Sequence, residues 1–194
     1  MVLPDSLKTI GDRAFMWCTG LESIKIPNGV TSIGDNAFQF CISLKEIEFP
    51  DSLKTIGDCA FEACNEVDLI KIPNGLNVNI SSTFPRNPNL VIETSNRHYN
   101  VLDSIVCFDD VLIWCNPSLT GRLVLPHEIV SIDESAFRGC KSLNEVVLPD
   151  SLKSIGKSAF NGCNALVSII IPKGSLTHFK KILDESYHHL LVEK

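Results

Sequence analysis

Residues 18–40, CTGLESIKIPNGVTSIGDNAFQF, form one unit of a repeat that runs through most of the chain. The unit reads C-x2-L-x2-I-x-I-P-x2-V-x2-I-G-x2-A-F-x2, and its key residues recur 23 positions apart. A repeat of this length is one supersecondary unit that cannot bury its apolar side alone. The units are therefore expected to stack into a solenoid whose core consists of columns of equivalent residues.

Two sets of equivalent residues mark the expected columns. We predict that the phenylalanines form an interior spine and that the cysteines, with one asparagine, form a structural ladder beside it. The spine consists of Phe15, Phe38, Phe61, Phe84, Phe137 and Phe160, and the ladder consists of Cys18, Cys41, Cys64, Asn87, Cys140 and Cys163.

The first half of each unit predicts a strand. In LESIKIP, Ile24 and Ile26 lie on one side of an extended chain and Ser23 and Lys25 on the other. A proline turn ends the strand, and a second, shorter apolar piece follows. Gly34 then predicts a corner, because glycine accepts a left-handed backbone. The segment DNAFQFC is expected to make a helical turn that places its phenylalanine in the interior.

The unit resembles the BspA-like leucine-rich repeats of bacterial surface proteins, which share the pattern LxxIxIPxxVxxIGxxAFxxC. The resemblance covers residues 1–75 and 121–172 closely. It implies an α/β repeat fold: a right-handed leucine-rich-repeat solenoid of about eight rungs, each rung being one turn of the chain. Parallel strands are expected on one face, short helical or turn segments opposite, and a helical cap at the C-terminal end.

We expect one leucine-rich-repeat domain over residues 1–194. Residues 1–75 and 121–172 hold regular repeats, residues 76–120 a degenerate repeat with a hairpin insertion, and residues 173–194 a helical cap. The cap is indicated by apolar residues at helical spacing: Leu176, Phe179, Ile182, Leu183 and Leu190. The chain opens halfway through a repeat, so self-association through this N-terminal edge is a further expectation.

The pattern breaks in the fourth repeat. Asn87 stands where cysteine is expected, and Asn96 stands where proline is expected. A strict 23-residue count places Glu93 on the inward side of its strand, which indicates a one-residue slip or a β-bulge. Further on, residues 104–108 and 111–115 are two apolar runs around Asp109 and Asp110, and they predict a β-hairpin in which Cys107 faces Leu112.

Composition excludes several classes of partner. The net charge is -6, with acidic and basic residues interleaved, so nucleic acid is not expected as a ligand. No apolar stretch approaches the roughly 20 residues of a membrane-spanning helix, so no membrane insertion is expected. The first residues show no signal peptide, and a cytoplasmic location stays open. The family resemblance implies instead a cell-surface or extracellular protein.

The eight cysteines admit three chemical interpretations. Ladder neighbours would have Cα atoms about 5 Å apart, but their Cβ atoms point the same way, which disfavours disulfides. No second close pair of ligands completes a zinc site. Thiol catalysis needs one cysteine in an electropositive pocket, whereas five equivalent cysteines favour a shared packing role as buried thiols. We therefore expect no catalytic residue, no cofactor and no metal.

The remaining candidates for function lie on the outward side of the strands. One column has Ser23, Glu46, Leu69, Arg122, Glu145 and Ser168, and the other has Lys25, Glu48, Lys71, Val124, Val147 and Ile170. The charged first half and the apolar second half each form a candidate contact surface. We selected as candidate partner contacts Lys25, Glu46, Glu48, Lys71, Arg122, Val124, Val147 and Ile170.

Three functional hypotheses follow. The first is a non-catalytic module that binds a protein, such as a host extracellular protein, or a glycan; the family resemblance implies a role in adhesion. The second is a structural spacer in a longer surface repeat protein, without a ligand of its own. The third, most remote hypothesis is a cysteine hydrolase.

Overall fold

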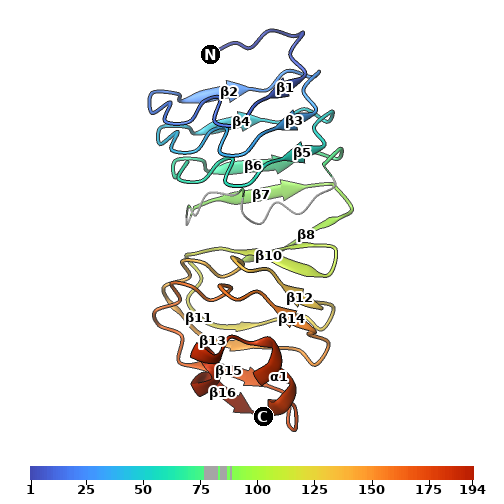
Figure 1. The fold of residues 1–194 in the computed structure, drawn as a ribbon, viewed down its shortest axis with the longest axis vertical. Helices are drawn as coiled ribbons and strands as arrows, with labels where there is room; N and C mark the ends of the chain where they lie inside the picture. The colour runs from blue at the N-terminus through green and yellow to red at the C-terminus, as the bar shows by residue number, and fades with distance from the viewer. Residues whose placement is uncertain (77–82, 84–86, 88) are drawn as a thin grey trace. The chain divides into compact units, whose positions relative to one another are not determined.

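The computed structural model describes residues 1–76, 83, 87 and 89–194. The chain forms two compact units, Met1–Val101 and Leu102–Lys194, and each is described here by itself. Within each unit the chain winds through short, stacked strands joined by turns (Figure 1). The fold is a β-solenoid of about eight turns with repeats of about 23 residues and little helix, so the predicted solenoid is confirmed. The prediction of one domain stays a prediction.

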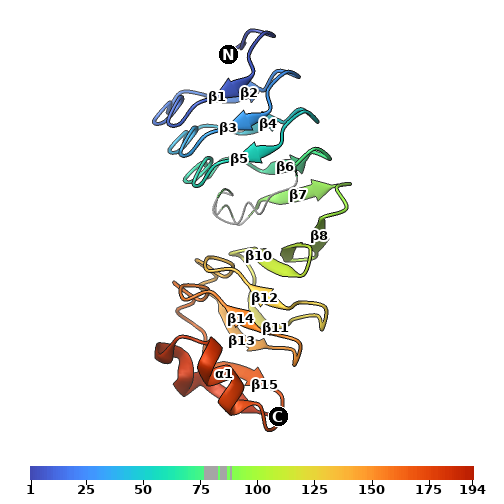
Figure 2. The ribbon, with the colours of Figure 1, turned by 45° about the vertical axis from the view of Figure 1, so that its right-hand side comes forward.

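Each regular repeat of the first unit contributes two strands rather than one. The LxxIxI segments form β2 (Ser23–Lys25), β4 (Glu46–Glu48), β6 (Leu69–Ile72) and β7 (Val91–Thr94), which pair in parallel as β2-β4 and β6-β7. The second apolar pieces form β1 (Thr9–Ile10), β3 (Ser32–Ile33) and β5 (Thr55–Ile56), which pair as a separate parallel sheet. The views in Figures 1 and 2 show these two rows of strands in the blue and cyan repeats.

The fourth repeat is one residue shorter than the others. β6 and β7 pair Ile70 with Ile92 and Lys71 with Glu93, an offset of 22 residues with no bulge. The predicted irregularity at Glu93 is therefore a one-residue slip, and it places Glu93 on the exposed side. In this register Asn96 is equivalent to Asn74 rather than to a proline. Phe84 of the predicted spine lies outside the described residues.

The AFxxC segments are turns, not helical turns. Alternate amides bond to the next repeat, as Phe38 N–H donates to Ala60 O at 2.8 Å, and the amides between them bond within the turn, as Cys41 N–H donates to Phe38 O at 3.1 Å. The residue before the cysteine has a left-handed backbone, with φ values of 61° at Phe40, 60° at Ala63 and 82° at Gly139. Because alternate amides pair with the next repeat, consecutive i→i−4 helical bonds do not form, and the segments opposite the strands are turns, one of the two forms predicted.

The glycine at each corner has a different role from the one predicted. Gly34 and Gly57 do not have positive φ values. Instead, a Cβ atom on Gly57 would lie 2.5 Å from the backbone nitrogen of Asp35 in the preceding repeat. Asp35 also accepts a 2.9 Å hydrogen bond from the Asp58 amide, so the two chains approach closely at this corner. Glycine is needed here because only a residue without a side chain permits that approach.

The second unit repeats the two-strand arrangement after the predicted hairpin. β9 (Ile105–Phe108) and β10 (Val111–Cys115) are antiparallel, and Cys107 faces Leu112, as predicted. β12 (Ser131–Ile132) and β14 (Ser154–Ile155) extend this sheet from β10 in parallel. The other row consists of β11 (Gly121–Val124), β13 (Leu143–Val147) and β15 (Ser168–Ile171). β8 (Tyr99–Leu102) lies at the boundary between the two units.

The C-terminal segment contains a strand that the sequence pattern did not predict. The predicted helix is present as α1 (Leu176–Ile182), with Phe179 fully buried, and a 3-10 helix (Glu185–Leu190) follows. β16 (Leu191–Glu193) then pairs in parallel with β15, matching Ile170 to Val192. The segment therefore continues the sheet by one strand in addition to packing α1 on the core.

The core consists of the predicted columns. Phe38 stacks on Phe15 and Phe61 with ring centroids 5.0 and 5.1 Å apart, and Phe137 stacks on Phe160 at 4.8 Å. The inward strand residues, such as Ile24 and Ile70, are also buried. Burial of one such side chain contributes about 1.5–3 kcal/mol. The outward strand residues are not part of this core, and they form the surface on which a binding site can lie.

Candidate outer-face site

The outward residues of β2, β4, β6 and β7 form the surface that we call the outer face of the first unit. One of its columns alternates in charge along the stack: Lys25, Glu48, Lys71 and Glu93. Lys25 Nζ lies 3.0 Å from Glu48 Oε2, and Lys71 Nζ lies 3.5 Å from Glu93 Oε2. All four side chains are well exposed, so each ion pair contributes no more than about 1 kcal/mol.

The second column of the outer face changes from polar to apolar. Ser23 and Glu46 are register partners in β2 and β4, and Leu69 and Val91 are register partners in β6 and β7. Leu69 is 37% exposed and Val91 is 54% exposed, so two apolar side chains lie together on the surface. The sequence interpretation did not include Val91, because a strict 23-residue count aligned it with Asp68. The sequence feature that indicates the outward position of Val91 is the one-residue shortening of this repeat.

A pocket of about 750 Å³ opens on this face between β4 and β6. It brings together three of the predicted contacts, Glu46, Glu48 and Lys71. The remaining lining residues are Lys45, Ile47, Phe49, Asp68 and Leu69. Lys25 does not line it and instead borders a separate pocket of about 360 Å³ near Met1 and Pro27.

The predicted contacts of the second unit form a smaller surface than expected. Arg122 Nε lies 2.9 Å from Glu145 Oε1, and Ser168 Oγ donates to Glu145 Oε2 at 3.0 Å. Val124 is 58% exposed, but Ile170 is only 5% exposed. Ile170 lies between its register partners Val147 and Val192. The inclusion of Ile170 as a contact residue is therefore wrong, because β16 adds a strand beside it.

The ladder cysteines lie against the backbone of the preceding repeat. The thiols of Cys41, Cys64 and Cys163 donate to the carbonyl oxygens of Phe15, Phe38 and Phe137 at 3.1, 3.1 and 3.2 Å. Cys140 makes longer contacts of 3.8 and 3.6 Å to the carbonyls of Cys115 and Asn116. Each of these thiols is buried and is a weak donor that adds a second bond to a carbonyl; Phe15 O, for example, already accepts from Cys18 N–H at 3.1 Å.

Asn87 supplies the same kind of contact with a stronger donor. Its side-chain amide donates to Val67 O at 2.8 Å and to Asp68 Oδ1 at 3.0 Å, and the residue is buried. Cys18 is exposed, unlike the ladder cysteines that follow it. The ladder thus combines thiol and amide donors at equivalent positions of the repeat.

Two of the buried thiols, those of Cys64 and Cys107, are poorly suited to act as nucleophiles. The hydrogen bond with Cys41, together with burial, raises the pKa of the Cys64 thiol. Burial raises the pKa of Cys107 to about 11. The thiolate is the reactive form, and a raised pKa keeps it scarce at neutral pH. None of the eight cysteines forms a disulfide, and the described residues contain no cluster of three His, Cys, Asp or Glu side chains that would hold a metal ion.

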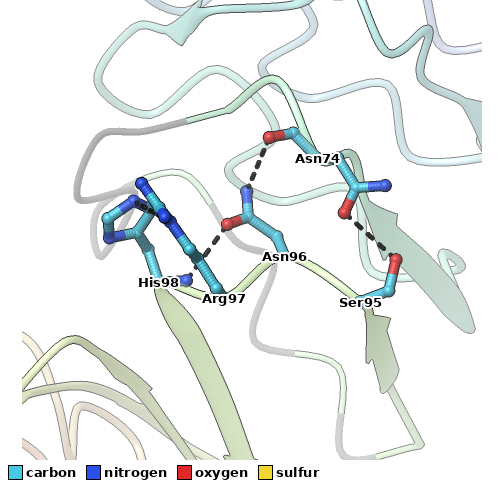
Figure 3. A pocket seen from close by; sticks show the side chains of 5 residues that line it. All are labelled: Asn74, Ser95, Asn96, Arg97 and His98. Atoms are coloured by element: carbon cyan, nitrogen blue, oxygen red, sulfur yellow. Dashed lines mark hydrogen bonds between the residues drawn. The ribbon is translucent and has the colours of Figure 1, made fainter.

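A second, polar pocket of about 440 Å³ lies after β7 and is lined by Asn74, Ser95, Asn96, Arg97 and His98 (Figure 3). Asn96 is buried and its amide donates to the carbonyl oxygens of Pro73 at 2.9 Å and of Leu76. Its Oδ1 accepts from the His98 amide at 3.1 Å. These bonds fix the turn after β7, so Asn96 has a structural role that the sequence interpretation missed.

The fold and its repeat define a class of protein: a leucine-rich-repeat solenoid with buried thiol and phenylalanine columns. The profile of the BspA type leucine rich repeat region matches residues 1–104 and 113–188 in six copies. The chain therefore belongs to the BspA-type leucine-rich repeat family. The predicted family membership is confirmed.

Several solved structures share the fold. The pneumococcal vaccine antigen PcpA is 26% identical with a TM-score of 0.72, over 84% of this chain and 42% of PcpA. A leucine-rich repeat protein of T. pallidum is 26% identical with a TM-score of 0.53, over 86% of this chain and 77% of that one. A leucine rich cell surface protein of Faecalibacterium prausnitzii is 21% identical with a TM-score of 0.53, over 86% and 64% of the two chains.

The chain corresponds to only part of the related proteins. This chain spans less than half of the length of PcpA. No curated protein sequence matches it. Among the residues that the structure describes, no helix has the length and apolar character to cross a membrane. The homologous structures come from bacterial leucine-rich-repeat proteins, one of them a cell surface protein.

Proposed function

We propose that this chain is a non-catalytic binding module of a bacterial cell-surface or secreted protein, and that the outer face of the first unit contacts an extracellular protein or a glycan. One observation carries the proposal: the pocket of about 750 Å³ on that face, lined by Glu46, Glu48 and Lys71. A concave surface that combines apolar and charged side chains is the usual form of a recognition site.

The family context supports the same proposal. Repeat solenoids present extended strand faces on which partners bind. The related structures include a vaccine antigen and a cell surface protein, which is consistent with a role outside the cell. Surface location of this chain is part of the proposal and is testable by labelling intact cells that produce it with a membrane-impermeant reagent.

A structural spacer is the second candidate, and the ion pairs favour it. Lys25 and Glu48, and likewise Lys71 and Glu93, pair with each other along the stack. Charges that neutralise one another on the surface leave less potential for a partner. Cysteine catalysis has the least support, because the hydrogen bond with Cys41 raises the pKa of the Cys64 thiol and burial raises the pKa of the Cys107 thiol.

A binding screen with charge-reversed variants tests the proposal. The immobilised chain is exposed to extracellular-matrix proteins, plasma proteins and a glycan array. The screen is repeated with the triple variant Glu46→Lys, Glu48→Lys and Lys71→Glu. A matched control reverses exposed charges of the second unit away from the strand face: Glu134→Lys, Asp150→Lys and Lys153→Glu.

We expect a ligand that binds the native chain and the control but loses at least about tenfold in affinity for the triple variant, since rim and pocket charges set both association and specificity. If no ligand binds, the result supports the hypothesis of a structural spacer. If a ligand binds the triple variant as well as the native chain, the outer face of the first unit is not the binding surface.

A further inference from the structure

The outer row of strands in the first unit is interrupted between β4 and β6. In the second unit, β11, β13, β15 and β16 form one continuous parallel sheet. In the first unit the equivalent strands form two separate pairs, β2-β4 and β6-β7. The pocket of about 750 Å³ lies at this interruption, because its lining residues come from both strands.

The interruption leaves two backbone edges unpaired. In intact parts of the row, Ile26 N–H donates to Glu48 O at 3.1 Å and Leu148 N–H donates to Ile170 O at 2.9 Å. The equivalent bond, from Phe49 N–H to Lys71 O, is absent within the described part of the chain. Unpaired strand edges present donors and acceptors to which another peptide backbone can bond.

Phe49 distinguishes this rung from the others. The equivalent position in β7 holds the half-buried Thr94, and in five other rungs it holds a buried Ile or Leu: Ile26, Ile72, Leu125, Leu148 and Ile171. Phe49 is half-buried, lines the pocket and packs edge-on against Phe61 with ring centroids 5.5 Å apart. The larger aromatic ring therefore occupies the place where the two strands fail to pair. Beside it, Leu69 adds a second exposed apolar side chain.

The charges that remain available in the pocket are mainly acidic. The pocket is lined by three acidic residues and two lysines. Lys71 is paired with Glu93, and Glu48 is paired with Lys25. The side chain of Glu46 makes no hydrogen bond or ion pair with the described residues. Asp68 has one amide partner, Asn87, at 3.0 Å, and a carboxylate accepts several further bonds.

We propose that the gap between β4 and β6 binds an extended segment of a partner protein in which an apolar side chain stands next to a lysine or arginine. The apolar side chain contacts Phe49 and Leu69, and the cation lies near Glu46 and Asp68. The segment lies along the pocket on the outer face, where β4 and β6 do not pair. This inference rests on the proposed function and gives the binding face a partner chemistry; a glycan ligand at this pocket contradicts it.

Three labelled octapeptides test the partner chemistry by fluorescence anisotropy with the full chain. In the first, leucine alternates with lysine; in the second, leucine alternates with glutamate; in the third, serine alternates with lysine. We expect the leucine–lysine peptide to bind at least about tenfold more tightly than either other peptide, since both the apolar contact and the charge contribute.

Two variants locate the binding in the gap. Phe49→Ile installs the residue found at other rungs, so it is expected to retain the fold and to weaken the leucine–lysine peptide about tenfold. Glu46→Gln keeps the shape of an exposed side chain and is expected to weaken binding and reduce its salt dependence. The control Glu134→Gln, in the second unit, is expected to leave the affinity unchanged. If Phe49→Ile does not fold, the affinity of the Glu46→Gln variant for the leucine–lysine peptide tests the inference.

The outcomes separate the inference from the proposed function. Equal binding of the three peptides, or unchanged binding by both pocket variants, overturns the inference. A glycan or an acidic protein that binds through the outer face supports the proposed function and overturns the inference. A leucine–lysine peptide whose binding needs Glu46 and Phe49 supports both the inference and the proposed function.

Discussion

The residue before the ladder cysteine has a left-handed backbone in both units, but it is alanine in one repeat of the first unit and glycine in one repeat of the second. Exchanging the two residue types at these places is expected to change the stability in opposite directions. Ala63 has a φ value of 60° in the first unit, whereas Gly139 has a φ value of 82° at the equivalent place in the second. A left-handed backbone costs a residue with a Cβ atom about 1–2 kcal/mol. Glycine avoids this cost but loses about 0.5–1 kcal/mol more backbone entropy on folding. The variants Ala63→Gly and Gly139→Ala therefore act in opposite directions.

The magnitude follows from these two terms. Ala63→Gly is expected to stabilise the fold by about 0.5–1 kcal/mol, since its methyl group is only half-buried and little burial is lost. Gly139→Ala is expected to destabilise by about 1 kcal/mol. A Cβ atom on Gly139 meets nothing within 4 Å, so the loss reports backbone strain and not a clash. For a chain of this size, 1 kcal/mol shifts Tm by about 2–4 °C.

Urea unfolding followed by circular dichroism measures the midpoint and slope for each variant, and a thermal scan gives Tm. The control Ala60→Gly alters a fully buried alanine without positive φ in the same turn, and it is expected to destabilise by about 1–2 kcal/mol. If Ala63→Gly destabilises as Ala60→Gly does, the reasoning from the left-handed backbone is refuted.

Four further predictions concern the thiols, the corner glycine and the surface ion pairs. Iodoacetamide at pH 8 should label the exposed Cys18 at least about a hundredfold faster than the buried Cys107. The reason is that a pKa of about 11 leaves about 0.1% of the Cys107 thiol as thiolate at this pH. Peptide mass spectrometry measures both labelling rates, and equal rates would contradict the prediction. As pH rises from 9 through 11, the stability contributed by this buried thiol should decline, because the unfolded state releases the proton first. Gly57→Ala should lower the unfolding free energy by more than about 2 kcal/mol, because its Cβ would overlap the preceding repeat; a loss below 0.5 kcal/mol in urea would show that the corner relaxes. A double-mutant cycle on Lys25 and Glu48 should give a coupling of no more than about 1 kcal/mol, falling with salt, and a larger, salt-insensitive coupling would mean a more buried pair.

The candidate site shows where sequence-based prediction stops. The alternation of LESIKIP identified the outward residues of each strand, and Glu46, Glu48 and Lys71 do line one pocket. The pocket itself depends on whether β4 and β6 pair, and pairing between strands 23 residues apart depends on side-chain packing that no local pattern reports. The exposed partner residue Val91 was missed for a related reason, since a single deleted residue changes every alignment after it.

The sequence by itself determined the period of the repeat, the phenylalanine and cysteine columns, the hairpin at Asp109 and the family. These features depend on local periodicity and on turn residues, which each unit carries within its own residues. The tertiary structure alone decided the 22-residue register at Glu93, the close approach that requires Gly57, the gap beside Phe49 and the burial of Ile170 under the added strand β16. Each of these depends on contacts between neighbouring turns of the solenoid, and such contacts exist only once the turns have stacked.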